Sequence, residues 1–192
     1  RWSIQRPNSY PSEFGEDKVL KNLFLYRNGT YLDIGCHHPI RESNTYWLYK
    51  KLDWSGINID LSEASIKLFD HFRPNDINIQ APVSHKSEEV TCYVFADLHC
   101  MNTIDEPFAM SVAQKTGLAY KKIKMKTALV DELIRVHRVQ KIDFLNVDIE
   151  GMDKHVLESF PFGRIQPNVI ASENHPDSFT ANVLIFEKMA ID

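Results

Sequence analysis

A chain of 192 residues with 43% hydrophobic and 25% charged side chains has the size and apolar content of one globular domain. We expect a single domain over residues 1–192, with residues 1–15 as a polar N-terminal arm. A net charge of -4 without a basic face argues against nucleic acid as a partner. The sequence shows no membrane span, and its three cysteines lack paired spacing, which favours a reducing, cytoplasmic location.

Hydrophobic periodicity predicts strands that alternate with helices along the chain. The first half is predicted to contain a helix from Glu16 to about Tyr26, a strand at 31–34, a helix capped by Ser43, a strand at 57–59, a helix capped by Ser62 and a strand at 77–81. The second half is predicted to contain strands at 90–95 and 122–126, a helix at 107–115, a helix capped by Thr127, a strand at 142–147, a helix ending before Pro161, and strands at 168–172 and 182–186. This alternation is typical of an α/β fold with a mainly parallel sheet.

Acidic residues stand at the ends of most of the predicted core strands. The residues at these ends are Asp33, Asp60, Ala81, Asp148 and Glu173. The carboxyl ends of parallel strands meet at one edge of the sheet, and ligands bind there near the switch in strand order. We therefore expect the functional site at this negatively charged edge.

The segment 30–39 predicts a strand followed by a glycine turn. Gly35 permits a close backbone approach to a ligand, but two histidines and a proline follow it, so the G-x-G-x-x-G pattern is absent. A pyrophosphate needs several such approaches at a helix N-terminus, so a cofactor without phosphate, S-adenosylmethionine, fits better. Asp33 would then meet the ammonium group of that cofactor, or would only hydrogen-bond the amides of the turn.

Asp60 ends the second predicted strand. A carboxylate at this place can accept hydrogen bonds from both ribose hydroxyls of an adenosine. The alternative is an acid that only supports the entry to the next helix, where Ser62 provides the cap.

A third cluster follows the last two predicted core strands. If these strands are neighbours, their end residues converge beside the cofactor, where carboxylates either bind a divalent cation or act as a base. The candidate catalytic residues are Asp148, Glu150 and His175, and the candidate ligands for Mg²⁺ are Asp148, Glu173 and Asn174. Glu150 is alternatively a first-turn acid that complements the helix dipole, and His175 a surface-loop residue.

Five segments, taken in this order, resemble the FkbM-type methyltransferases. They are residues 14–17, 31–39, 43–46, 56–60 and 142–151. The resemblance spans about residues 12–173 and implies a Rossmann-like class I methyltransferase fold with helices on both faces of the sheet. It also implies S-adenosylmethionine as cofactor and methyl transfer to the hydroxyl of a small molecule, in such families often a sugar or a natural product.

The resemblance also implies roles for single residues. The turn 33–35 would hold the methionine part of the cofactor, Asp60 its ribose and Ala81 its adenine, with Asp148 near the methyl group. The cofactor-binding candidates are Asp33, Gly35, His37, Asn44, Thr45, Asp60, Ala81 and Asp148. Pro39 departs from a glycine that is frequent in the family. Only residues 182–186 match the usual final hairpin, which implies either a fold trimmed at its C-terminal hairpin or loop residues that are missing from this sequence.

Two other functions are compatible with the same pattern. One is a nicotinamide-dependent oxidoreductase on a similar sheet, against which the missing G-x-G-x-x-G argues. The other is a non-catalytic binding protein that keeps the methyltransferase fold.

Overall fold

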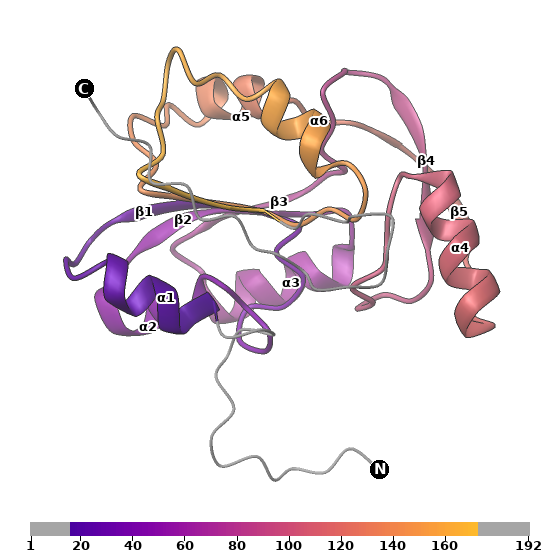
Figure 1. The fold of residues 1–192 in the computed structure, drawn as a ribbon, viewed down its shortest axis with the longest axis horizontal. Coiled ribbons are helices and arrows are strands. Elements are labelled where there is room, and N and C mark those ends of the chain that lie inside the picture. Colours follow the sequence, from indigo (N-terminus) through magenta and orange to yellow (C-terminus); the bar gives the residue numbers. More distant parts are fainter. Residues whose placement is uncertain (1–15, 173–192) are drawn as a thin grey trace, which may run out of the picture.

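The centre of the molecule is a five-stranded parallel sheet, seen in a computed structural model that describes residues 16–172. Its strands are β1 (Thr30–Ile34), β2 (Ser55–Asp60), β3 (Ile77–Gln80), β6 (Phe144–Val147) and β7 (Val169–Ser172). Their order is β3-β2-β1-β6-β7, with every neighbouring pair parallel (Figure 1). The chain builds outward from β1 to β3 and then returns to the other side of β1. The strand order therefore reverses between β1 and β6, where open α/β sheets bind their ligands.

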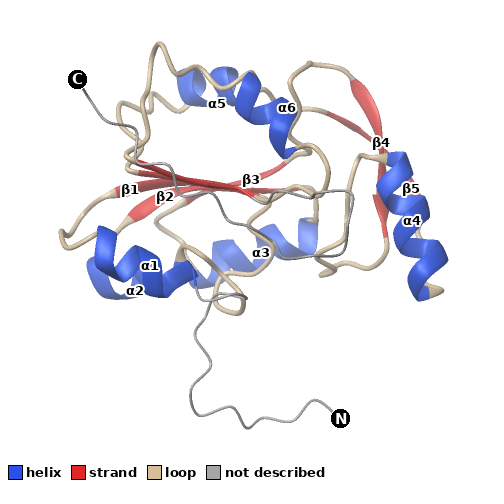
Figure 2. Cartoon of the chain, viewed as in Figure 1, coloured by secondary structure: helices blue, strands red, loops and turns tan. Residues whose placement is uncertain are grey.

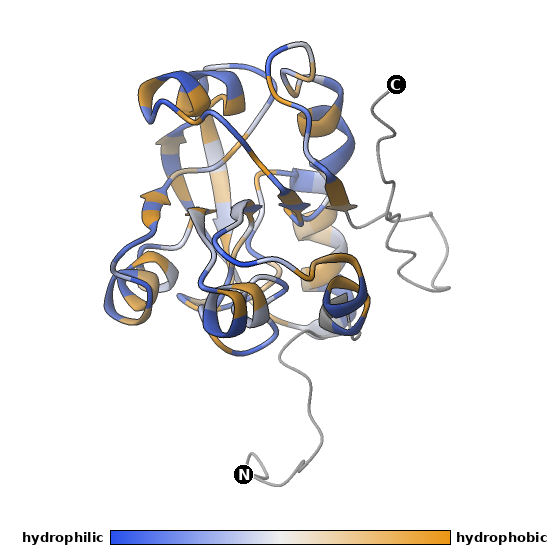
Figure 3. Ribbon diagram, turned by 90° about the vertical axis from the view of Figure 1, so that its left-hand side faces the viewer, coloured by the Kyte–Doolittle hydropathy of each residue, from blue (hydrophilic) through white to orange (hydrophobic). Residues whose placement is uncertain are grey.

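Helices cover both faces of this sheet. The helices α1 (Glu16–Leu23), α2 (Tyr46–Leu52) and α3 (Glu63–Phe72) lie on one face, and α5 (Val130–Val136) and α6 (Asp153–Glu158) lie on the other (Figures 1 and 2). This arrangement confirms the predicted α/β class and is consistent with a Rossmann-like methyltransferase fold. The helices carry both hydrophobic and hydrophilic residues, as expected for elements with one buried side (Figure 3).

The central strands β1 and β6 are buried along nearly their whole length, which explains why they read as mostly apolar runs. In β1, Leu32 and Ile34 pack with Ile134 and Val156 in the cluster under α5 and α6. Tyr31, which alternates with them, belongs to the cluster under α1 and α2. The two hydrophobic clusters hold the sheet between its helix layers. The strand ends, where a site is expected, are therefore fixed in position.

A smaller unit is inserted between β3 and α5. It consists of the directly paired antiparallel strands β4 (Glu89–Val94) and β5 (Lys121–Lys126), with α4 (Glu106–Thr116) between them in the sequence (Figure 2). The sequence correctly predicts all three elements, including the lysine-rich edge strand. Asp105 starts α4, because its carboxylate accepts a hydrogen bond from the Phe108 amide at 2.8 Å.

Two predicted helix caps are wrong. The helix expected after Ser43 begins at Tyr46, and the Ser43 hydroxyl instead accepts a hydrogen bond from Arg73 at 2.9 Å. The helix expected after Thr127 begins at Val130, because the Thr127 hydroxyl bonds backbone groups at residues 86 and 88. Both hydroxyls bond partners that are distant in the sequence, in place of the backbone amide in the first helical turn that a capping side chain would bond. The cap at Ser62 is confirmed by its contact with the Ser65 amide at 3.2 Å.

Several element ends also differ from the prediction by one to three residues. The helix α1 ends at Leu23 rather than near Tyr26, since the Tyr26 side chain reaches Asp143 at 2.7 Å and its carbonyl accepts from Trp54. The strand β3 ends one residue before Ala81. The predicted arm at 1–15 and the predicted strand at 182–186 lie outside the described residues. Within residues 16–172, no helix is both long enough and apolar enough to cross a bilayer.

Candidate functional site

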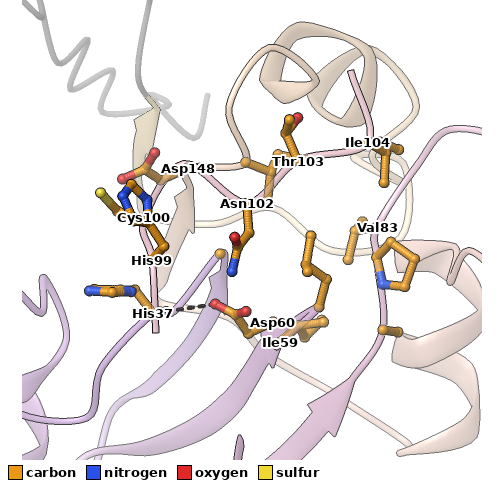
Figure 4. Close-up of a pocket in the computed structure, with 15 residues that line it drawn as sticks. His37, Ile59, Asp60, Val83, His99, Cys100, Asn102, Thr103, Ile104 and Asp148 are labelled. Carbon is orange, nitrogen blue, oxygen red and sulfur yellow. Dashed lines mark hydrogen bonds between the residues drawn. The ribbon is translucent and has the colours of Figure 1, made fainter. Parts of the chain in front are cut away.

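An open cavity lies at the carboxyl ends of β1, β2, β3 and β6 (Figure 4). Three parts of the chain line it. The strand ends contribute Gly35, His37, Asp60 and Asp148, the segment after β3 contributes Ala81, Pro82 and Val83, and the loop before α4 contributes His99, Cys100, Asn102, Thr103 and Ile104. Among the described residues that line the cavity there is no lysine and no arginine.

The structure gathers part of the predicted site in this cavity. Its lining includes the predicted residues Gly35, His37, Asp60, Ala81 and Asp148. The lining does not include Asp33, Asn44, Thr45 or Glu150. The remaining candidates, Glu173, Asn174 and His175, lie outside the described residues.

Asp60 lies on the floor of the cavity and fixes the turn that leads away from β1. Its Oδ2 accepts a hydrogen bond from the His37 amide at 2.9 Å (Figure 4), and its Oδ1 accepts from the Ser62 amide at 2.8 Å. Burial raises the pKa of Asp60 to about 6, and these two amides limit the rise. Each carboxylate oxygen keeps a second lone pair that can accept a hydrogen bond from a ligand.

Gly35 is required at its position by the neighbouring strand. Its φ is +80°, and an added Cβ would lie 1.7 Å from the backbone carbonyl oxygen of Asp148. The sequence suggested a close approach to a ligand. The structure shows a close approach between the ends of β1 and β6.

Asp33 is buried below the cavity. Its Oδ2 accepts from the Thr45 hydroxyl at 2.6 Å and its Oδ1 accepts from the Asn146 amide group at 2.9 Å. Asn44 in turn donates to Asn146 at 3.0 Å. The side-chain oxygens of Asp33 therefore bond side chains, not the turn amides considered from the sequence. Burial raises the pKa of Asp33, and the hydrogen bonds from Thr45 and Asn146 oppose that rise.

Glu150 is not the first-turn acid that the sequence offered as an alternative. It precedes α6 with a φ of +48°, and the first-turn acid is Asp153. Its backbone carbonyl accepts from the Thr103 hydroxyl at 2.8 Å, which ties the loop before α4 to the end of β6.

The loop 99–104 is the part of the cavity wall that sequence reasoning missed. The Asn102 side chain closes it, because Oδ1 accepts from the Phe95 amide and Nδ2 donates to the Ala96 carbonyl, both at 2.9 Å. His99 Nδ1 accepts from the Met101 amide at 3.2 Å, so the neutral ring carries its proton on Nε2. Asn and Thr between a strand and a helix indicate a turn, but not that the turn faces a site.

The described residues give no metal site. Within residues 16–172, no group of three or more His, Cys, Asp and Glu side chains could hold a metal ion. Two of the three predicted magnesium ligands, Glu173 and Asn174, lie outside this range.

Comparison with known proteins agrees with the geometry. The family described as Methyltransferase FkbM domain matches residues 33–189, from the end of β1 onward. Neither a search of curated proteins nor a search of solved structures gave a match. The family match covers most of the chain and includes every residue that lines the cavity. The chain therefore belongs to the FkbM methyltransferase family.

Proposed function

We propose that the protein is an S-adenosylmethionine-dependent O-methyltransferase that acts on a hydroxyl of a sugar or natural product. The observation that carries this proposal is the position of Asp60 at the end of β2, facing the cavity beside the switch in strand order. A carboxylate there accepts hydrogen bonds from ribose hydroxyls.

The chemistry of the cavity wall fits this cofactor. Ala81, Pro82 and Val83 provide an apolar wall against which we place the adenine. Asp60 and Asp148 are the acidic residues of the lining, which suits a cofactor that carries a sulfonium and an ammonium group. A dinucleotide would bring a pyrophosphate, and the described lining offers no lysine or arginine to neutralise it. The oxidoreductase is therefore the weaker alternative.

When bound, the cofactor supplies an activated methyl group. The protein has to align the acceptor oxygen with that group and to remove the hydroxyl proton. We assign proton removal to Asp148, because it is the candidate base that lines the cavity among the described residues. His99, which also lines the cavity, carries its proton on Nε2 in the neutral ring, so this nitrogen would donate a hydrogen bond rather than accept a proton.

A magnesium ion is the second way to handle this proton. Asp148 with Glu173 and Asn174 would supply three oxygen ligands, a set that suits Mg²⁺ better than Zn²⁺. The ion would lower the pKa of the acceptor hydroxyl.

The proposed activity is tested by an acceptor screen that reads the release of S-adenosylhomocysteine. We expect release with a sugar or natural-product hydroxyl and none when the acceptor is omitted. A protein that binds the cofactor but turns over no acceptor in a broad screen would instead be the non-catalytic binding protein.

Asp60→Ala is expected to weaken the binding of S-adenosylhomocysteine at least tenfold. The substitution removes charge-assisted hydrogen bonds worth about 1.5–3 kcal/mol, and tenfold in affinity corresponds to about 1.4 kcal/mol. Isothermal titration calorimetry on folded protein measures the change. Asp70→Ala, which removes an exposed carboxylate from α3, is the matched control and should leave the affinity unchanged. An unchanged affinity in Asp60→Ala would rule out the ribose role.

The same affinity is expected to fall as the pH is lowered through about 6, the pKa of Asp60. Protonation removes the charge that the ribose hydroxyls meet, so Kd should rise about tenfold for each pH unit below that value. The folded pKa lies above the ordinary value of 3.8, so protonation between these values favours the folded state. Weaker binding in this pH range would therefore not result from unfolding caused by protonation of Asp60. In Asp60→Ala the pH dependence of Kd should vanish. If it persists, another titrating group causes it.

A further inference from the structure

Arg73 is a completely buried cation at the C-cap of α3. Its guanidinium donates to the Pro39 carbonyl, with Nε at 3.1 Å, and to the hydroxyls of Ser43 at 2.9 Å and Thr45 at 2.8 Å. These three acceptors all lie on the turn that connects the cavity to α2. A fourth acceptor is the Tyr31 hydroxyl at 3.3 Å.

Two hydroxyls connect this cation to two buried aspartates. The Thr45 hydroxyl accepts from Arg73 and donates to Asp33 at 2.6 Å. The Tyr31 hydroxyl accepts from Arg73 and donates to Asp76. Burying an unpaired charge is costly, so the two carboxylates are the counterions that keep Arg73 in place.

Aromatic rings complete the surroundings of the guanidinium. Its Cζ lies 4.9 Å from the ring centroid of Phe69 and 5.2 Å from that of Tyr49. Rings at this distance attract a cation and exclude water from it. Since water cannot replace a lost partner here, each hydrogen bond from the guanidinium to Pro39, Ser43 or Thr45 restricts the turn strongly.

The turn is thus held at both ends. At its start, the His37 amide bonds Asp60, and the His37 carbonyl accepts from the Ser65 hydroxyl. At its end, Arg73 bonds the segment 39–45. Between Asp33 and this end lie Gly35 and His37, two residues of the cavity wall.

We propose that Arg73 is a positioning residue of the cofactor cavity, which acts through Thr45 and Asp33 to hold the turn 35–45 in its binding conformation. Arg73 does not line the cavity itself. The proposal rests on the proposed function for its ligand, and it adds a role that local sequence patterns do not show.

The two hydroxyl bridges provide a matched pair of variants. Thr45→Val and Tyr31→Phe each remove one buried hydroxyl that joins Arg73 to an aspartate. Thr45 lies on the turn, whereas Tyr31 is the second residue of β1, at the far end of that strand from Gly35. A merely structural role predicts similar effects of the two variants on stability and on binding. A positioning role predicts that only Thr45→Val affects the cavity.

We expect Thr45→Val to raise the Kd for S-adenosylhomocysteine at least fivefold. Thr45→Ser keeps the hydroxyl and should bind with the wild-type Kd. Tyr31→Phe should lower the Tm comparably but leave Kd within twofold. Near-ultraviolet circular dichroism confirms that each variant is folded. An unchanged Kd in Thr45→Val, or equal weakening in Tyr31→Phe, would overturn the proposal.

Amide hydrogen exchange without ligand separates this proposal from the proposed function. Thr45→Val should speed exchange within residues 36–45, and Tyr31→Phe should not. If wild-type protein fails to bind S-adenosylhomocysteine, the proposed function fails, while this exchange pattern still decides the role of Arg73. Equal exchange of the turn in both variants would refute that role.

Discussion

Gly35→Ala is expected to lower both the stability and the cofactor affinity more than any other single substitution proposed above, because it affects the fold and the cavity together. A Cβ at this position would lie 1.7 Å from the carbonyl oxygen of Asp148, and backbone cannot move aside as a flexible side chain can. The φ of +80° adds about 1–2 kcal/mol for any residue with a Cβ. Relief of the clash requires β1 and β6 to separate at the point where the strand order reverses.

Gly117→Ala is the matched control for this experiment. Gly117 has a φ of +73°, but nothing lies within 4 Å of its Cβ position, so the substitution carries the backbone strain without the clash. We expect it to cost about 1–2 kcal/mol and to leave cofactor affinity intact. Gly35→Ala should lower the Tm much further and abolish binding of S-adenosylhomocysteine. A Gly35→Ala protein as stable as Gly117→Ala, with normal binding, would contradict the account of this turn.

Asp148→Asn is expected to lower kcat by about 100- to 10,000-fold, the usual contribution of a general base. The amide keeps the shape of the side chain but cannot accept the hydroxyl proton at neutral pH. Binding of S-adenosylhomocysteine should change much less than kcat. Steady-state kinetics with the acceptor found in the screen measures the rate, and calorimetry measures the binding.

Glu150→Gln is the control for that substitution, since Glu150 does not line the cavity. It should retain turnover once shown to be folded. Assays after chelation of divalent metals separate the two roles considered for Asp148, which are general base and magnesium ligand. Turnover that survives exhaustive chelation excludes the metal, whereas a loss that added magnesium reverses supports the magnesium role. Normal kcat in Asp148→Asn would remove Asp148 from the chemistry in either case.

The sheet and the acidic strand ends could be predicted from the sequence because both depend on local patterns. Buried parallel strands read as apolar runs, and each strand end is marked by its last residue. Gly35, Asp60 and Asp148 therefore reach the cavity as expected.

The partners of Asp33 and Thr45 could not be predicted in this way. The Thr45 hydroxyl that bonds Asp33 also accepts a hydrogen bond from Arg73, which lies far along the chain at the end of α3 and carries no local signal of its contacts. Ser43 and Thr127 likewise carry no local sign of their distant hydrogen-bond partners, so the sequence predicts helix caps at both positions. The loop 99–104 has no periodicity, and its place at the cavity follows from the contacts of Asn102.

We expect the cavity at the strand ends to bind S-adenosylmethionine. Isothermal titration of wild-type protein and Asp60→Ala with S-adenosylhomocysteine and with NAD tests it most directly. We predict one molecule of S-adenosylhomocysteine bound per chain with micromolar affinity, at least tenfold weaker binding in Asp60→Ala, and no binding of NAD. Binding of NAD in place of S-adenosylhomocysteine, or affinity for S-adenosylhomocysteine that is equal in the two proteins, would contradict it.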